Sequence, residues 1–300
     1  MSRIALVKTT DREAGVKKAM ALLDSVPVSG KSVMLKPNFN SADPTPGSTH
    51  NDTLRSLVRE LQSRGAKNIT VADRSGMGDT RTVMKEKGIF EMSRSLGFDV
   101  VVLDELAKDD WVAFNPRSSH WQNGFYIAKP FAQAESVVQT CNLKTHRFGG
   151  HFTMSLKNTV GMAARLIPGV DWDFMRELHS SRYQRLMIAE LNTAYQPDLI
   201  VMDAIEAFVD RGPEIGRRVR PEVVLAGTDR VAMDAVGVAI LRMFGTTPEV
   251  NEGPIFEQEQ IARAVELKLG IDSPEKIELV ATDDESKSFA AKVREVLAKG

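Results

Sequence analysis

Short apolar runs alternate along the chain with segments whose apolar positions recur at helical spacing. Ser32–Leu35, Asn68–Ala72 and Leu199–Met202 are typical of strands. Leu54, Leu57, Val58 and Leu61 lie on one face of a predicted helix. The strand-like runs lack a clear period of two, as expected when both faces of a sheet are buried. The pattern predicts an α/β fold whose sheet is mainly parallel or mixed, with helices on both of its faces.

Two segments interrupt this alternation of strands and helices. Residues 110–126 contain two Trp, an Asn-Pro and an Asn-Gly turn signal, which favours an antiparallel edge hairpin. No strand is evident in residues 142–196, so we expect a mostly helical insertion there. The chain has no internal repeat, low-complexity segment or linker. We therefore expect residues 1–300 to form a single α/β domain that carries the insertion.

The composition of the chain argues against several classes of protein. The 39 Lys and Arg residues nearly cancel the 40 Asp and Glu residues, which argues against nucleic-acid binding through a strongly basic face. The single cysteine, Cys141, excludes a four-cysteine iron–sulfur cluster built by this chain alone. No apolar stretch reaches the length of a membrane span, and the first residues lack the features of a signal peptide. We expect a cytoplasmic protein with no membrane partner.

Polar residues follow four of the predicted strands. The segments begin at Lys36, Asp73, Cys141 and Asp203. Ligands of open parallel sheets bind beyond the carboxyl ends of the strands. If the four strands are parallel, these segments share one rim, and that rim is the predicted functional site.

The densest polar cluster lies at residues 144–158, KTHRFGGHFTMSLKN, which holds three Lys or Arg, two His and no acidic residue. His146 and His151 are candidates for acid–base catalysis or metal binding. Lys157 is a candidate anion clamp or Schiff-base amine. The Gly149-Gly150 pair between the two histidines indicates a loop. The alternative is a solvated basic loop without a function.

These observations define three sets of candidate residues. The predicted catalytic residues are His50, His146, Lys144 and Lys157. The predicted substrate-binding residues are Lys36, Asn38, Thr49, Asn158, Asp73 and Asp203. The candidate metal ligands are His50, His146, His151 and His179. Structural roles are the alternatives: Thr49 or Asp52 as a helix cap, His50 as an exposed loop residue, and Asp73 as a cap of the loop that follows it.

Several ordered motifs resemble the bacterial and archaeal family known as domain of unknown function 362, in its stand-alone form without a ferredoxin-like domain. They are LKPNFN, GSTH, GAKNITVADRSG, KTHRFGGHFTMSLKNTVG, YQPDLIVMDAI, RGPEIG and LAGTDRVAMDAVG, and they run from about Ser32 to Gly237. The resemblance carries the family's recurring polar positions onto most of the candidates above, and onto Asp229 and Asp234. We expect Asp229 to cap a helix and Asp234 to make a buried hydrogen bond.

The resemblance supports the fold and the site but implies no reaction. One hypothesis is an enzyme that acts on a small carboxylate or phosphate metabolite through the Lys, His and Asn side chains of the rim. The second is a metal- or cofactor-binding accessory or redox protein without its own iron–sulfur cluster, in which a divalent metal is the candidate cofactor. The third is a non-catalytic ligand-binding or scaffold module. The expected partners are a small anion and, as a candidate, a second copy of the chain in a homodimer.

Overall fold

The computed structural model describes residues 1–300, and one ten-stranded sheet lies at its centre. Eight strands form a continuous path in the order β12 (Ile277–Val280), β1 (Ser2–Lys8), β11 (Val223–Gly227), β9 (Leu199–Phe208), β7 (Ser136–His146), β2 (Ser32–Lys36), β3 (Asn68–Asp73) and β4 (Asp99–Val102). Only β11 runs against the others on this path. The prediction of an α/β fold with a mainly parallel sheet is confirmed.

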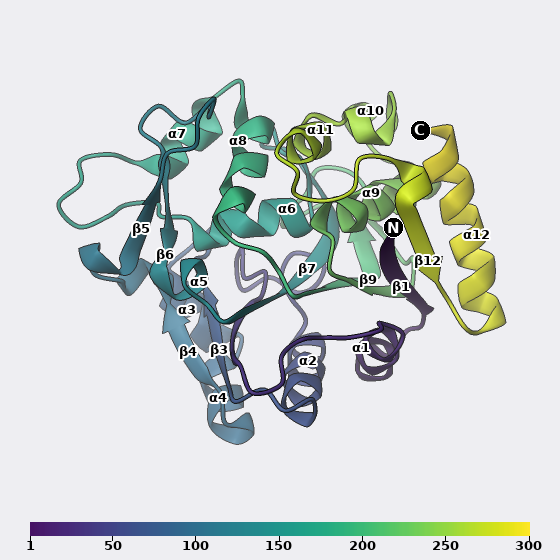
Figure 1. Cartoon of the computed structure of the whole chain (residues 1–300), viewed down its shortest axis with the longest axis horizontal. Helices are drawn as coiled ribbons and strands as arrows, with labels where there is room; N and C mark the ends of the chain where they lie inside the picture. Colours follow the sequence, from purple (N-terminus) through teal and green to yellow (C-terminus); the bar gives the residue numbers. More distant parts are fainter.

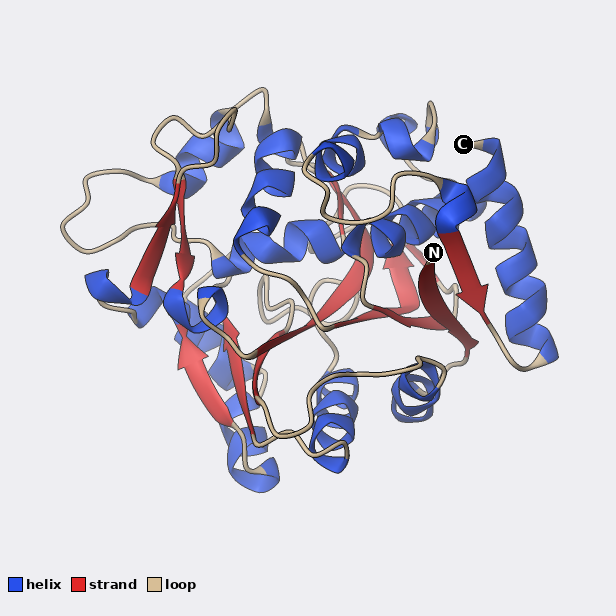
Figure 2. Ribbon diagram, in the orientation of Figure 1, coloured by secondary structure: helices blue, strands red, loops and turns tan.

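Helices cover both faces of the sheet (Figure 1). One face packs against α9 (Arg230–Met243), α11 (Glu259–Glu266) and α12 (Asp284–Lys299). The opposite face packs against α1 (Arg12–Ala21), α2 (Asn51–Ser63), α3 (Thr80–Glu86) and α4 (Ile89–Leu96). In Figure 2 the strands form a central layer between these two groups of helices. No helix combines the length and apolar character that crossing a bilayer requires.

The two-sided burial explains the missing period of two in the strands. In β1, Ile4 and Leu6 point into the core under α9, whereas Ala5 and Val7 point into the core over α1 and α2. Successive side chains of a strand face opposite sides, so each of the four residues from Ile4 to Val7 meets an apolar layer. Apolar residues therefore fill consecutive positions in the middle of β1, whereas Arg3 and Lys8 nearer its ends are only partly buried.

Residues 111–128 form a separate two-stranded sheet beside the main one. Strands β5 (Trp111–Phe114) and β6 (Phe125–Ala128) pair antiparallel, as the turn signals predict, but neither pairs with the main sheet. This hairpin packs on α5 (Lys129–Ala132), α7 (Phe174–Ser180) and α8 (Gln184–Leu191). It is therefore a module of its own and does not extend the sheet edge.

The prediction that residues 142–196 lack strands is wrong for the first part of that segment. Strand β7 continues to His146 and is followed by β8 (His151–Thr153), which pairs antiparallel with it. The polar residues do not end β7 because β9 pairs with it as far as Lys144, across a register shift after Asn142. The mostly helical part begins with α6 (Ser155–Asn158).

The remaining short elements lie between these main ones. They are strand β10 (Arg218–Val219), helix α10 (Pro248–Asn251) and the 3-10 turns Leu103–Glu105, Lys108–Asp110, Thr159–Met162, Asn192–Ala194, Ile255–Glu257 and Pro274–Lys276. Strand β10 pairs with β9. The expected cap of α9 is present, since the Asp229 side chain accepts hydrogen bonds from the backbone N–H groups of Val231 and Ala232.

Candidate functional site

A cavity of about 480 Å³ opens where β2, β3 and β7 end. These strands are parallel neighbours in the sheet, so their carboxyl ends share one edge, as the rim prediction requires. Helix α6 and the residues after it close another side. The lining residues with polar or charged side chains are Lys36, Asn38, Asn40, Asp73, Arg74, Lys144, His146, Thr153, Lys157, Asn158, Arg165, Asp173, Arg176 and His179.

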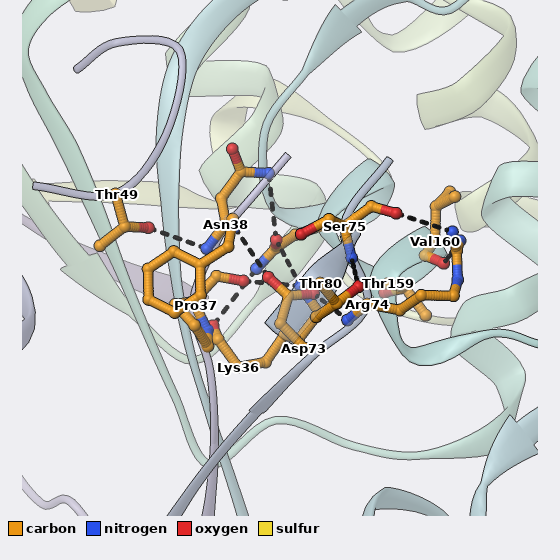
Figure 3. A network of polar contacts seen from close by, with 12 residues as sticks. Lys36, Pro37, Asn38, Thr49, Asp73, Arg74, Ser75, Thr80, Thr159 and Val160 are labelled. Carbon is orange, nitrogen blue, oxygen red and sulfur yellow. Dashed lines mark hydrogen bonds and ion pairs between the residues drawn. The ribbon is translucent and has the colours of Figure 1, made fainter. Parts of the chain in front are cut away.

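A buried ion pair joins the ends of β2 and β3. Lys36 Nζ lies 2.6 Å from Asp73 Oδ1, and both side chains are almost fully buried. Figure 3 shows the two side chains pointing toward each other. The backbone N–H groups of Phe39 and Arg74 donate to the Asp73 carboxylate, each at 2.7 Å. Burial lowers the pKa of Lys36 and raises that of Asp73, whereas their mutual attraction opposes both shifts.

Two asparagines connect this pair to the rest of the cavity. Asn158 Oδ1 accepts from Lys36 Nζ at 3.2 Å, and Asn158 Nδ2 donates to the Thr140 carbonyl at 3.3 Å. Asn38 Oδ1 accepts from Lys144 Nζ at 2.9 Å. Each amide therefore holds a lysine in a defined position, and together they link β2, β7 and α6.

Lys144 is a buried cation without a carboxylate partner. It belongs to β7, and its ammonium group donates to Asn38 and to the carbonyl of Gly47. Burial, and then the charge of Lys157, lower the pKa of Lys144 to about 7. A bound anion would oppose both effects, because it would stabilise the charged form.

Lys157 lies on α6 and is 7% exposed. It lines the cavity but makes no ion pair with any acidic residue. Burial, and then the charge of Arg74, lower the pKa of Lys157 to about 8. Arg74 itself is buried and donates to the backbone carbonyls of Ala163, Ser75 and Val160. Two more positive charges therefore face the cavity without a carboxylate counter-ion.

Two histidines line the same cavity. His146 is the last residue of β7, and burial followed by the charges of Lys157 and Lys144 lowers its pKa well below the ordinary value. Its Nδ1 atom is buried and has no hydrogen-bond partner in the protein. His179, on α7, places Nδ1 2.7 Å from the carbonyl of Met175. A neutral imidazole such as His146 can accept a proton.

Two glycines lie so close to side chains of the site that no larger residue would fit in their place. A Cβ atom on Gly150 would lie 2.8 Å from Lys157 Cε and 2.9 Å from His146 Nδ1. One on Gly161 would overlap the Asp73 carboxylate and the Lys36 ammonium group. Glycine at both positions therefore allows the close approach of the site side chains.

Helix α6 is positioned by a residue that lies outside the cavity. Asp234 of α9 accepts from the backbone N–H groups of Ser155, at 2.7 Å, and Leu156, at 3.1 Å. This is the buried hydrogen bond expected for Asp234. Because Lys157 and Asn158 follow in the same turn, Asp234 sets where both side chains enter the cavity.

Three of the predicted rim residues do not line the cavity. The Asp203 carboxylate is occupied by Arg12 Nε at 2.8 Å and by the Thr53 hydroxyl at 2.7 Å, which ties β9 to α1 and α2. His50 is the half-exposed N-cap of α2, and its Nδ1 accepts from the backbone N–H of Asp52. Thr49 is buried, and its hydroxyl accepts from the backbone N–H of Asn38.

The four candidate metal ligands do not lie together. His146 and His179 line the cavity, whereas His50 caps α2 and His151 lies in β8 outside the cavity lining. No group of three or more His, Cys, Asp or Glu side chains is placed to hold a metal ion. Cys141 is buried in the core, and burial raises its pKa well above the ordinary value, as expected for an inert thiol.

Sequence reasoning missed the arginines of the site. Arg74 follows Asp73 directly, so its position after a strand was the available signal. Arg165 and Arg176 come from the insertion and carry no local signal. With these residues, the lining contains six Lys or Arg side chains and two carboxylates, one of which is already paired with Lys36. Basic side chains therefore outnumber carboxylates in the lining by six to two.

Comparison with known proteins gives one family and a distant structural likeness. The lactate racemase apoprotein from Thermoanaerobacterium thermosaccharolyticum superposes with a TM-score of 0.48 at 14% identity, covering 98% of this chain and 85% of the other. None of the curated proteins matches this chain. The family model Domain of unknown function (DUF362) matches residues 33–239, which is well over half of the sequence. The chain belongs to this family.

Proposed function

We propose that the protein is an enzyme that binds a small metabolite carrying a carboxylate or phosphate group in this cavity. One observation carries the proposal: Lys144, Lys157 and Arg74 are buried around one cavity without carboxylate partners. A buried cation without a counter-ion is costly, and a bound anion removes that cost. The cavity volume of about 480 Å³ suits a small molecule.

The cavity residues divide into two roles under this proposal. Lys36 is held by three acceptors, namely Asp73, Asn158 and the Pro37 carbonyl, so it maintains the shape of the site. Lys144 has one ammonium N–H group left after its two hydrogen bonds, and this group is free to donate to a ligand. His146 is the acid–base candidate because its imidazole is neutral near pH 7 and lines the cavity.

Calorimetric titration with pyruvate and with inorganic phosphate tests the binding step. We expect at least one of these anions to bind the wild type, and Lys144→Gln to weaken that binding by about tenfold or more, since it removes a charge-assisted hydrogen bond. Lys17→Gln, at an exposed position on α1, is the control and should bind as the wild type does. Equal affinity of the Lys144→Gln and Lys17→Gln proteins would contradict the proposal.

Binding should also be coupled to proton uptake. Lys144 has a pKa of about 7 in the free protein, so at about pH 8 most molecules carry the neutral amine. An anion raises that pKa, and binding at this pH therefore takes up a proton and weakens as the pH rises, by up to about tenfold per pH unit. Titrations in two buffers of different ionisation enthalpy measure the uptake, which Lys144→Gln should reduce.

A further inference from the structure

The three lysines of the cavity differ in how many hydrogen bonds the protein makes to them. Lys36 Nζ donates to three acceptors, which uses all its N–H groups. Lys144 Nζ donates to two. Lys157 Nζ makes no hydrogen bond or ion pair with the protein, although the residue is only 7% exposed and lines the cavity. Lys157 therefore presents a free nitrogen to a ligand.

The surroundings of Lys157 favour a neutral amine, which is the nucleophilic form of lysine. Burial and the positive charge of Arg74 lower its pKa to about 8. No carboxylate is paired with it to restore the charged form. A large fraction of the molecules thus carries a reactive amine at mildly alkaline pH.

A group able to transfer protons lies beside this amine. His146 Nδ1 and Lys157 Cε both lie within 2.9 Å of the point where Gly150 would place a Cβ atom. The His146 imidazole is buried, and Nδ1 has no partner in the protein. An amine nucleophile next to a neutral base is the arrangement that covalent amine catalysis requires.

We propose that Lys157 forms a Schiff base with the carbonyl carbon of a small keto acid whose carboxylate is bound by Lys144. This inference rests on the proposed function and specifies its substrate class. Lys157 Nζ attacks the carbonyl carbon to form the C–N bond as the C=O π bond breaks, and His146 carries one of the two Nζ protons to the carbonyl oxygen. His146 then carries the second Nζ proton to the resulting hydroxyl group, which leaves as water when the C=N bond forms. Hydrolysis of the imine reverses these steps without any oxidant or reductant.

Reductive trapping tests this step directly. The wild type is incubated with sodium borohydride and either pyruvate, 2-oxobutanoate or 2-oxoglutarate, and intact-mass and peptide mass spectrometry locate the added group. We expect one reduced keto acid per chain, attached to Lys157, with at least one of the three compounds. Lys157→Met and Lys157→Arg should lose this label, whereas Lys17→Gln should keep it.

Two further measurements make the result decisive. Circular dichroism and the unfolding transition establish that the Lys157 variants are folded, and Lys157→Arg keeps the positive charge. Lys144→Gln should lower the extent of labelling at Lys157 at a given keto acid concentration. Labelling that is absent with all three compounds, or spread equally over exposed lysines, overturns the inference. If the wild type still binds pyruvate or phosphate, only the Schiff base is overturned; if neither binds, the proposed function fails as well.

Discussion

At the residue scale, the site is built from lysines that differ in their partners. Lys36 has Asp73 as a counter-ion, whereas Lys144 and Lys157 have amide groups or nothing. Burying an amine without a counter-ion destabilises its charged form, which is why the pKa values of Lys144 and Lys157 fall to about 7 and about 8. The protein therefore keeps two lysines in a state that a ligand can change.

Replacing Lys157 by Met should stabilise the protein. The folded-state pKa of about 8 lies below the ordinary 10.5, so the charged amine costs free energy at low pH. We expect the free energy of unfolding to rise by about 2 kcal/mol near neutral pH. Wild-type stability recovers as the pH rises from about 8 to about 10.5, because the unfolded chain then binds more protons, and the gain in the variant should shrink.

Urea denaturation near neutral pH and again near pH 9.5 measures that difference. Lys17→Met, on the exposed side of α1, is the matched control and should change stability little at either pH. A loss of stability in Lys157→Met at both pH values would show that the charged amine is not destabilising.

At the element scale, the short helix α6 depends on the long helix α9. Asp234 accepts two backbone N–H groups at the start of α6, and no other side chain does so. Burial raises the pKa of Asp234 to about 7, which shows how thoroughly the carboxyl group is removed from water. The position of Lys157 and Asn158 in the cavity thus depends on one residue in another helix.

Asp234→Ala should uncouple these two helices. The substitution leaves two buried N–H groups without an acceptor, and we expect it to lower the free energy of unfolding by about 2–4 kcal/mol. It should also reduce borohydride labelling of Lys157 in the protein that remains folded. Asp79→Ala removes the exposed cap of α3 and is the control; it should cost about 1 kcal/mol and leave the labelling unchanged.

At the scale of the whole molecule, one buried carboxylate connects α8, α11 and the small β5–β6 hairpin. Glu190 of α8 accepts from the backbone N–H of His120 at 2.9 Å, in the connection between β5 and β6, and from Arg263 of α11 at 2.9 Å. Its side chain is 1% exposed. The small hairpin is therefore fastened to the main fold by charge as well as by apolar packing.

Glu190→Gln should loosen this junction. Removing the charge leaves Arg263, whose side chain is 13% exposed, without its buried partner, and we expect a loss of about 3 kcal/mol in the free energy of unfolding. Glu266→Gln is the matched control, since Glu266 pairs with the same arginine but is 64% exposed. Glu266→Gln should lower the free energy of unfolding by less than about 1 kcal/mol in the same denaturation experiment.

The sequence by itself determined the class of fold and the edge of the sheet at which polar side chains collect. Burial on both faces favours consecutive apolar residues, so the apolar runs within β1, β2 and β9, such as Leu199–Met202, indicate helices on both sides. Polar residues after such runs mark the ends of the strands. Lys36, Asp73 and Lys144 could therefore be selected as rim residues, although Lys144 lies within β7 and not after it.

Only the tertiary structure decided which of those polar residues share the cavity. Asp203 and Lys144 belong to neighbouring strands but differ in their surroundings. The Asp203 carboxylate accepts hydrogen bonds from Arg12 and Thr53. Lys144 donates to Asn38 and lines the cavity. Likewise, β7 extends through its polar residues to pair with β8 because the neighbouring strand β9 pairs with β7 as far as Lys144. Apolar periodicity is a local property and can be read from the chain. The partner of a buried charge comes from residues far away in sequence, and only the folded path of the chain brings them together.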